Sequence, residues 1–508
     1  MSISRLLRES AAKYPEKTVC YFEDKTISYQ MLDQNVSKVS AYLQKAGLSF
    51  QDRAAVLLPN RPEFIESYFA ILRCGGIAVT INPLFKGEEV KYILNDSQVS
   101  MIITNQAYLP MIESIWKYVP SLEKAVVVGG ESNGDTIAYE DIISSMEPVD
   151  CDVEVELDSV AACLYTSGTT GRPKGALLTH DNLIFDAYSV IEHIQVKDDE
   201  NYSCVLPLFH SFGQTVCMLV PIFSGASITL IEQFRPDTVL KEIADKKVTI
   251  FAGVPAMYGA FLSVIKKIKS YDLSSLKLCF SGGAPMPMEL MKAFEEEYSV
   301  VIIEGNGPTE TSPVSYCNPR YGLRKPGSVG IPIPGVFVKI VDDNDNQVPR
   351  GEVGEICVQG RNVMKGYLNQ PEATAEALKG GWFHTGDLGR MDEDGYIYIV
   401  DRKKDMIIVG GLNVYPREVE EIIYQHPKVA DAAVIGKQDH LRGEVAKAYV
   451  VLKEGESVEP REIILHCKEK LANYKVPKEV VIVEALPRTS TGKVDKKVLR
   501  EAETLGYL

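Results

Sequence analysis

Short runs of β-branched and apolar residues alternate with segments of helical period over most of this 508-residue chain. Residues 28–47 predict an amphipathic helix that Ser28 caps and Gly47 ends, and residues 52–60 predict a buried strand. Residues 248–258 and 276–287 repeat one pattern, in which a strand ends in Gly and Pro and a helix follows. This repetition favours an α/β fold with parallel sheets, whose ligands bind at the carboxyl ends of the strands.

The pattern changes after Gly327. Residues 335–360 and 393–411 predict strands joined by tight Asp, Asn and Gly turns, and residues 415–427 predict a short helix that Pro427 ends. A chain of this length exceeds one hydrophobic core. We therefore expect two domains, residues 1–401 and residues 402–508, with the junction in the sequence DRKKD.

Composition restricts the partners of the protein. The formal net charge of −15 repels nucleic acid and anionic membrane surfaces, so we expect neither as a partner. We expect no integral membrane segment, because no apolar run reaches spanning length, and no secretion, because the first residues lack an apolar signal region. The ten cysteines include no C-x-x-C pair, which favours reduced thiols over a zinc site. These features together predict a cytoplasmic protein.

One loop is too polar for a core and too rich in glycine for a strand: YTSGTTGRPKG, residues 165–175. Glycine lets backbone N–H groups converge on a phosphate, while the hydroxyl groups and Lys174 add further donors and a charge. A flexible surface turn is the alternative, but Pro173 stiffens the loop. Because Gly175 follows Lys174, the loop lacks the hydroxyl that holds Mg²⁺ in a Walker A motif. Magnesium therefore needs another ligand.

The loop resembles the signature loop of the adenylate-forming superfamily, which includes acyl-CoA synthetases, luciferases and peptide-synthetase adenylation domains. Further stretches similar to that family follow in its order, at residues 206–213, 281–285, 306–311, 381–389 and 486–497. The resemblance implies a large N-terminal domain that includes a β-barrel-like subdomain, and a small mobile α+β C-terminal domain. It also implies that seven residues of the loop hold the phosphates of ATP: Thr166, Ser167, Gly168, Thr169, Thr170, Gly171 and Lys174. Thr166 would in addition be a ligand of the metal.

The resemblance also assigns roles to single residues before the domain junction. His210 would lie beside the acyl carboxylate and the phosphates, Thr309 would contact phosphate, and Glu310 would ligate Mg²⁺, which prefers hard oxygen ligands. An isolated histidine is more often structural, so that alternative stays open. The adenine would lie against the turn and strand end formed by Gly282, Gly283, Ala284, Asn306 and Gly307.

Asn306 departs from the family pattern. Many relatives have Tyr or Trp at this position, whose ring stacks on adenine, and asparagine offers no such surface. Recognition of the base is therefore an open question, while recognition of the phosphates is not affected.

Four residues near and after the junction complete the implied site. Asp387 would accept hydrogen bonds from the two ribose hydroxyls, a task that suits an ionised carboxylate, and Arg402 would bind the same sugar. Lys404 falls at the hinge position of the family, and Lys493 at the catalytic lysine. A turn aspartate, a surface arginine and a basic tail are the plain alternatives.

Together these residues imply activation of a carboxylic acid in two steps. ATP and Mg²⁺ would give an acyl-adenylate and pyrophosphate, and coenzyme A would then take the acyl group as a thioester. In the second step the C-terminal domain would swing about Lys404, and the glycines Gly410 and Gly411 would line a narrow tunnel for pantetheine.

The whole chain looks most like bacterial medium- and long-chain fatty-acyl-CoA ligases, with the acyl tunnel near residues 251–258. Alternatives are a CoA ligase for an aryl or branched short-chain acid, an adenylating enzyme that loads a carrier protein, and a nucleotide-binding protein without activity. A homodimer is compatible with such a chain, but the sequence does not decide the oligomeric state.

Overall fold

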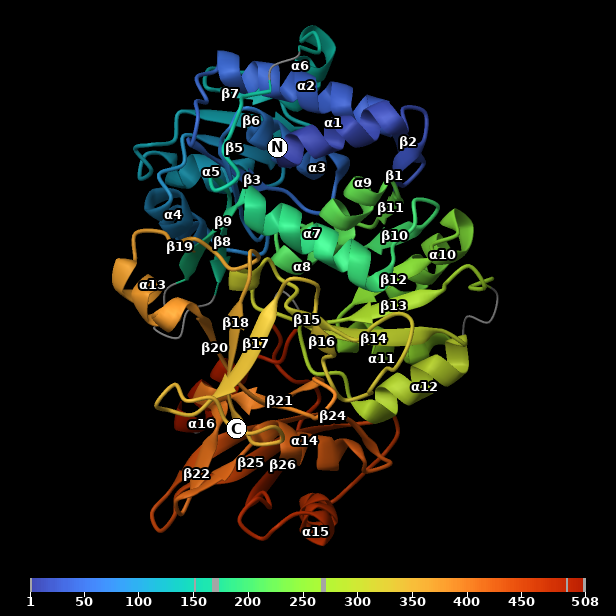
Figure 1. The fold of residues 1–508 in the computed structure, drawn as a ribbon, viewed down its shortest axis with the longest axis vertical. Coiled ribbons are helices and arrows are strands. Elements are labelled where there is room, and N and C mark those ends of the chain that lie inside the picture. Colours follow the sequence, from blue (N-terminus) through green and yellow to red (C-terminus); the bar gives the residue numbers. More distant parts are fainter. Residues whose placement is uncertain (1, 150–151, 167–172, 266–270, 490–491, 506–508) are drawn as a thin grey trace.

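The structure is a computed structural model that describes residues 2–149, 152–166, 173–265, 271–489 and 492–505 (Figure 1). Within these residues the strands form four sheets, two of them large and parallel-rich. The predicted α/β fold is confirmed. A large N-terminal domain contains three of the sheets, and a small C-terminal domain lies below them in Figure 1. The boundary between residues 401 and 402 stays a prediction.

The first large sheet has the order β19-β9-β8-β4-β3-β5-β6-β7. Its strands are β3 (Arg53–Leu57), β4 (Ile77–Thr80), β5 (Met101–Asn105), β6 (Lys124–Val128), β7 (Thr136–Ala138), β8 (Val160–Thr166), β9 (Lys174–Thr179) and β19 (Gly366–Tyr367). The second has the order β16-β15-β14-β13-β12-β10-β11-β1-β2. Its strands are β1 (Thr18–Phe22), β2 (Lys25–Ser28), β10 (Asn201–Cys204), β11 (Ser227–Leu230), β12 (Ile250–Gly253), β13 (Leu278–Ser281), β14 (Val301–Asn306), β15 (Tyr316–Cys317) and β16 (Ile331–Pro332).

The third sheet is antiparallel throughout and stands where the β-barrel-like subdomain is expected. Its strands, in the order β17-β18-β20-β21, are β17 (Phe337–Val341), β18 (Gly354–Gln359), β20 (Phe383–Met391) and β21 (Ile397–Arg402). The fourth sheet belongs to the C-terminal domain. It comprises β22 (Ile407–Val409), β23 (Leu412–Val414), β24 (Val429–Asp439), β25 (Gly443–Leu452) and β26 (Glu479–Ile482).

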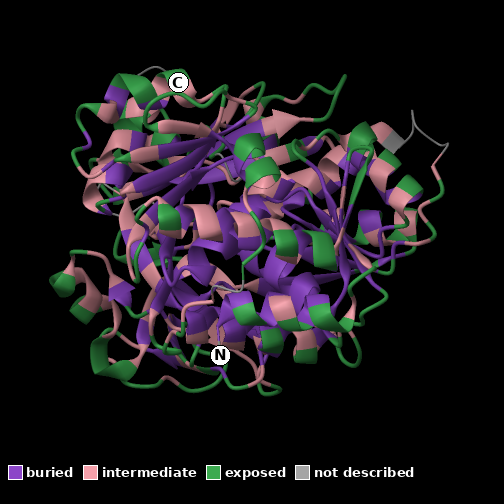
Figure 2. Ribbon diagram, turned by 90° about the horizontal axis from the view of Figure 1, so that it is seen from above, coloured by how far each residue is buried: buried purple, intermediate pink, exposed green. Residues whose placement is uncertain are grey.

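Helices cover these sheets (Figure 2). They are α1 (Ile3–Lys13), α2 (Tyr29–Lys45), α3 (Pro62–Arg73), α4 (Gly87–Asp96), α5 (Leu109–Trp116), α6 (Tyr139–Ser145), α7 (His180–Ile194), α8 (Ser211–Gln214), α9 (Val220–Ser224), α10 (Pro236–Lys246), α11 (Pro255–Ile265), α12 (Met288–Tyr298), α13 (Pro371–Ala377), α14 (Pro416–Tyr424), α15 (Pro460–Lys470) and α16 (Lys496–Leu505). Short π and 3₁₀ turns occur at Thr215–Leu219, Thr309–Thr311, Lys379–Gly381 and Lys403–Asp405. None of the helices in the described residues has the length and apolar surface that crossing a membrane would need.

Alternation along the strands explains why both faces of the large sheets are covered. In β3, Ala54 and Val56 pack into one apolar core, while Ala55 and Leu57 pack into another on the opposite face. Successive side chains of a strand point to opposite faces, so an unbroken apolar run predicts a strand buried on both sides. The prediction for residues 52–60 is therefore confirmed.

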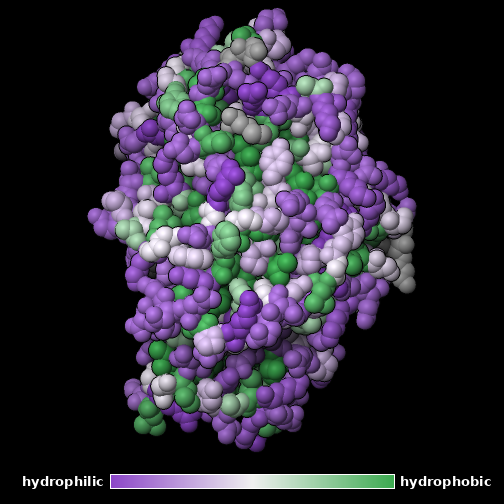
Figure 3. Space-filling view, viewed as in Figure 1, coloured by the Kyte–Doolittle hydropathy of each residue, from purple (hydrophilic) through white to green (hydrophobic). Residues whose placement is uncertain are grey.

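The predicted helix at residues 28–47 is also confirmed. α2 ends at Lys45, and the hydroxyl of Ser28 accepts a hydrogen bond from the N–H of Met31 at 3.2 Å. This capping bond satisfies one of the donors that the first turn of a helix leaves without a partner. Hydrophilic residues cover most of the face seen in Figure 3, with apolar side chains between them.

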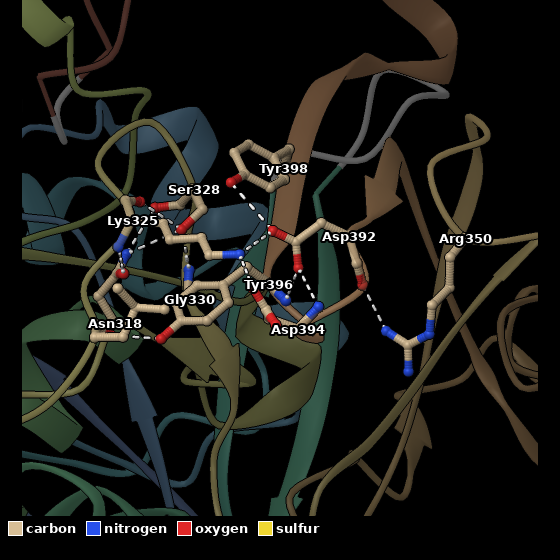
Figure 4. A network of polar contacts seen from close by, with 10 residues as sticks. Asn318, Lys325, Ser328, Gly330, Arg350, Asp392, Asp394, Tyr396 and Tyr398 are labelled. Atoms are coloured by element: carbon tan, nitrogen blue, oxygen red, sulfur yellow. Dashed lines mark hydrogen bonds and ion pairs between the residues drawn. The ribbon is translucent and has the colours of Figure 1, made fainter.

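A polar network fixes the turn between β20 and β21 to the segment that follows β15 (Figure 4). The carboxylate of Asp392 accepts hydrogen bonds from the backbone N–H groups of Asp394 and Tyr396, at 3.0 and 2.9 Å. It also accepts one from Lys325 Nζ at 2.6 Å. The ammonium of Lys325 contacts Asp394 as well. The network therefore holds together the two strands that carry Asp387 and Arg402.

Replacement of Asp392 by alanine is expected to destabilise this junction. The substitution removes the acceptor that two backbone N–H groups and the Lys325 ammonium share. Loss of this acceptor is expected to lower the free energy of unfolding by about 1–3 kcal/mol. Heat-induced unfolding of the N-terminal domain measures the loss. Asp394→Ala is the matched control, because Asp394 is more exposed and accepts only from Lys325, so its effect is expected to be smaller. Equal losses in the two variants would contradict this account.

Candidate functional site

Lys493 lies on a tight turn of the C-terminal domain that reaches into the N-terminal domain. The N–H of Thr489 donates to the carbonyl of Lys493 at 2.8 Å, and Gly492 has a φ of +83° that favours glycine. A Cβ atom added at Gly283 would lie 3.6 Å from Lys493 Cε, so the turn after β13 leaves room for this side chain. Lys493 closes a narrow pocket whose other lining residues are Leu206, Pro207, His210, Phe212, Gly213, Val254 and Gly283.

Charged groups from distant parts of the sequence surround Lys493. Burial and the nearby Arg402 guanidinium lower the pKa of Lys493 to about 8, while the carboxylates of Asp387 and Glu310 act in the opposite direction. Burial raises the pKa of the Asp387 carboxyl, and Arg402 and Lys493 oppose that shift. The structure thus brings four of the predicted site residues into one cluster of opposite charges.

Strand pairing places Asp387 beside Arg402. The two residues are register partners in β20 and β21, and Arg402 Nε lies 3.4 Å from Asp387 Oδ1. The N–H of Asp387 donates to the hydroxyl of Thr385 at 3.0 Å, which fixes the backbone at this point. Asp387 is about 9% exposed, so its carboxylate is a buried acceptor near Lys493 rather than a surface charge.

Glu310 is held by two hydroxyl groups. Thr166 donates to Glu310 Oε1 at 3.3 Å, and Tyr367 donates to the same oxygen at 2.9 Å. This geometry fits Mg²⁺, because it places a carboxylate next to a hydroxyl and both are hard oxygen ligands. Among the residues that the structure describes, no group of three or more His, Cys, Asp or Glu residues could hold a metal.

His210 is a neutral hydrogen-bond donor in this site. Burial and the Lys493 ammonium lower the pKa of His210 to about 3, so its imidazole is uncharged near neutral pH. Its Nδ1 accepts a hydrogen bond from the N–H of Phe212 at 3.2 Å. A neutral imidazole with Nδ1 as acceptor carries its proton on Nε2. The pocket therefore receives an N–H donor without a second positive charge.

Two of the predicted glycines lie so close to neighbouring groups that an added side chain would crowd them. A Cβ atom at Gly307 would lie 2.2 Å from the carbonyl oxygen of Pro313, and one at Gly282 would lie 3.0 Å from the ring of Phe212. Asn306 ends β14, where it pairs with Tyr316 of β15. The hydroxyl of Thr309 lies 3.1 Å from that of Ser211. Ala284 lies half-buried in the turn after β13.

The phosphate loop is described only at its two ends. Thr166 ends β8 and pairs with Lys174 at the start of β9, so the strands bring the ends of the loop together. Lys174 Nζ lies 5.1 Å from the ring centre of Tyr367, a cation–π contact. The other predicted residues of this loop lie outside the described residues: Ser167, Gly168, Thr169, Thr170 and Gly171.

Some predicted residues lie apart from the pocket. Gly410 and Gly411 form the exposed turn between β22 and β23, with φ values of +58° and +83°, and added Cβ atoms there would contact nothing within 4 Å. Lys404 is exposed in the short turn that follows β21. In the predicted acyl segment, Val254 lines the pocket, whereas Phe251 and Tyr258 pack edge to face at 5.4 Å in a buried aromatic cluster.

Two contributors to the site were missed from the sequence, Tyr367 and Ser211. Tyr367 contacts both Glu310 and Lys174, yet it lies in a two-residue strand whose pairing with β9 no local pattern indicates. Ser211 lies within the stretch that predicted His210. Its hydroxyl directly follows His210, which was predicted to lie beside the phosphates, and this position was the only sequence feature that pointed to Ser211.

Residues 7–368 match the AMP-binding enzyme family, and residues 418–493 match the AMP-binding enzyme C-terminal domain. A long-chain-fatty-acid–CoA ligase of Bacillus subtilis is 37% identical over 99% of this chain and 95% of its own length. The crystal structure of the anthranilate CoA ligase AuaEII in complex with anthranoyl-AMP superposes with a TM-score of 0.94 at 33% identity, and covers 100% of this chain and 98% of the other.

MatB from Rhodopseudomonas palustris is similar to this chain in two solved forms, each 32% identical with 100% of both chains covered. The TM-score is 0.92 against the ATP-bound form and 0.81 against the apo form. The arrangement of domains described above is thus more similar to the ATP-bound form.

The lowered pKa of Lys493 is directly measurable. Burial next to Arg402 predicts that the ammonium of the ligand-free protein loses its proton near pH 8 and carries its full charge only below that value. Lysine NMR as a function of pH measures the titration, with Lys493→Ala as the variant that assigns the signal. A midpoint near the ordinary lysine value of 10.5 would show that Lys493 is not buried in the pocket.

Tyr367→Phe tests whether Glu310 is the metal ligand. The variant keeps the ring over Lys174 but removes one hydrogen bond from the carboxylate, and loss of a partner that orients a metal ligand costs roughly tenfold or more in metal affinity. The Mg²⁺ concentration for half-maximal pyrophosphate release from ATP is therefore expected to rise about tenfold. Tyr398→Phe is the control, because the hydroxyl of Tyr398 in β21 donates to Asp392 instead. This control should leave the half-maximal Mg²⁺ concentration unchanged. An unaltered Mg²⁺ dependence in Tyr367→Phe would remove the support for Glu310 as a ligand.

Proposed function

Since this chain belongs to the AMP-binding enzyme family, we propose that it activates a fatty carboxylic acid with ATP and then transfers the acyl group to coenzyme A. The observation that carries this proposal is the insertion of Lys493 into a pocket that His210 lines, with the carboxylates of Asp387 and Glu310 close enough to act on its charge. The full-length similarity to a long-chain-fatty-acid–CoA ligase supports a fatty acid as the substrate.

The first step joins two anions, so its main requirement is the cancellation of charge. An oxygen of the substrate carboxylate forms a bond to the α-phosphorus of ATP, the bond to the bridging oxygen breaks, and pyrophosphate leaves. Lys493 supplies a positive charge where these groups meet, and His210 donates a hydrogen bond from Nε2. Asp387 holds the ribose. Magnesium, when bound at Glu310 and Thr166, supplies further positive charge beside the phosphates.

The second step exchanges AMP for a thiol. The sulfur of coenzyme A forms a bond to the acyl carbon, the bond from that carbon to the phosphate oxygen breaks, and AMP leaves while the thiol proton passes to solvent. Gly410 and Gly411 are the proposed lining of the pantetheine path. Because their turn is exposed and apart from the pocket, this role needs the C-terminal domain to turn about Lys404, with residues 402–508 moving as a unit.

A smaller acid is the second candidate substrate. Phe251 and Tyr258 pack at 5.4 Å, and Tyr258 packs at 4.9 Å on Phe294 of α12, so two large side chains of the segment predicted to line an acyl tunnel are held in a core. The similarity to an anthranilate CoA ligase agrees with an aryl acid. A carrier protein as acceptor in place of coenzyme A, a homodimeric state and a cytoplasmic location stay predictions.

A panel of fatty, branched and aryl acids tests the proposed substrate. Each acid is incubated with ATP and Mg²⁺, with and without coenzyme A, and pyrophosphate release and thioester mass are measured. Medium- or long-chain acids are expected to give the highest rate and a CoA-dependent thioester. A preference for aryl acids would reject the fatty-acid assignment, and pyrophosphate release without thioester would favour a carrier protein as acceptor.

Lys493→Ala is expected to separate the two half-reactions. Removal of the ammonium leaves the meeting anions unneutralised, and loss of such a charge lowers the rate of the first step by about 100-fold or more. Thioester formation from supplied acyl-AMP should be largely retained, because Lys493 has no part in that step. ATP–pyrophosphate exchange and thioester yield measure the two steps in separate assays. An equal loss in both would refute this division of roles.

A further inference from the structure

The two helices α14 and α15 of the C-terminal domain begin with the same residues, Pro-Arg-Glu, but their first turns are bound differently. α15 is capped locally, because the N–H of Glu459 donates to Glu462 Oε1 at 3.3 Å. α14 has no side-chain cap of its own at Tyr415. The N–H of Arg417 instead donates to Asp401 Oδ2 at 2.8 Å, so a residue of β21 caps this helix from outside the helix.

The side chain of Arg417 binds the same strand. Its guanidinium Nη1 donates to the carbonyl oxygen of Ile399 at 2.9 Å. Ile399 and Asp401 are alternate residues of β21, which is an edge strand of the third sheet. One arginine therefore uses both its backbone and its side chain to attach the C-terminal domain to the edge strand of the third sheet, where unpaired carbonyl groups need donors. α14 and β21 lie side by side in Figure 1.

A buried carboxylate faces the same arginine from the second sheet. Glu304 of β14 is about 3% exposed, and its Oε1 accepts a hydrogen bond from the N–H of Met286 at 3.1 Å. Burial raises the pKa of Glu304 to about 7, and the charge of Arg417 opposes that shift. Arg417 thus interacts with two sheets of the N-terminal domain.

We propose that Arg417 is a positioning residue for adenylate formation: it fastens the C-terminal domain in the arrangement that places Lys493 in the pocket. Ile399, Asp401 and Glu304 precede the proposed hinge at Lys404, and Arg417 follows it. A turn about Lys404 breaks all of these contacts. Arg417 does not touch the reacting groups, and it acts only through the position of Lys493. This inference rests on the proposed role of Lys493.

The position of the domain sets the rate of the first step. The hydrogen bond from the Arg417 guanidinium to Ile399, together with the charge of Glu304, is expected to shift the equilibrium between the two domain positions by roughly tenfold or more. Loss of the Arg417 side chain therefore lowers the fraction of molecules with Lys493 inserted. It leaves the second step intact, because that step uses the other arrangement.

The test compares Arg417→Ala with Arg461→Ala, the same position in α15, where arginine is exposed. ATP–pyrophosphate exchange and thioester formation from supplied acyl-AMP are measured for both variants and for Lys493→Ala. We expect Arg417→Ala to slow the exchange about tenfold and to leave thioester formation unchanged or faster. Arg417→Lys, which keeps the charge, should restore part of the exchange, and Arg461→Ala should match the unaltered protein.

Each other outcome has a definite meaning. Equal loss of both half-reactions in Arg417→Ala would overturn the proposal, because it would show a general structural role. No loss in either would overturn it as well. If Lys493→Ala separates the half-reactions and Arg417→Ala does not, the positioning role fails alone. If Lys493→Ala does not separate them, the proposed role of Lys493 fails, and the positioning role fails with it.

Discussion

The proposed first step depends on neutralising two anions that must touch. A carboxylate and a triphosphate repel each other, and the repulsion grows in a pocket that excludes water. Lys493 supplies a positive charge in this pocket. Its burial next to Arg402 lowers its pKa, whereas the carboxylates of Asp387 and Glu310 favour its charged form. A separate domain carries that lysine, so in the proposed mechanism the charge enters the pocket for the first step and leaves it for the second.

The sheets position the fixed half of this arrangement. β8 ends at Thr166, β14 leads into the segment with Glu310, and the middle of β20 carries Asp387, so residues more than 200 positions apart meet at one site. The hydroxyl of Tyr367 and the guanidinium of Arg402 then orient the two carboxylates. The antiparallel third sheet has a further task, because its edge strand β21 contributes both Arg402 and the anchor for α14.

Local chemistry explains which parts of this arrangement were predictable from sequence. The α/β fold followed from strand–glycine–helix repetition, and the residues around Lys493 followed from short stretches that resemble a known family. Tyr367 and Arg417 could not be found in this way, because their partners lie 57 and 16 residues away and only the folded chain brings them together. The filled aromatic cluster around Phe251 depends on side-chain packing, so an apolar stretch alone could not separate a tunnel wall from a core.

A crystal structure with a non-hydrolysable acyl-adenylate analogue would show whether the pocket at Lys493 is where the adenylate forms. We expect both ribose hydroxyls to bind Asp387 and the phosphate to lie between Lys493 Nζ and the ends of the loop at Thr166 and Lys174. The acyl group is expected to enter past Gly283. An analogue bound elsewhere, or bound here with Lys493 directed into solvent, would contradict these expectations.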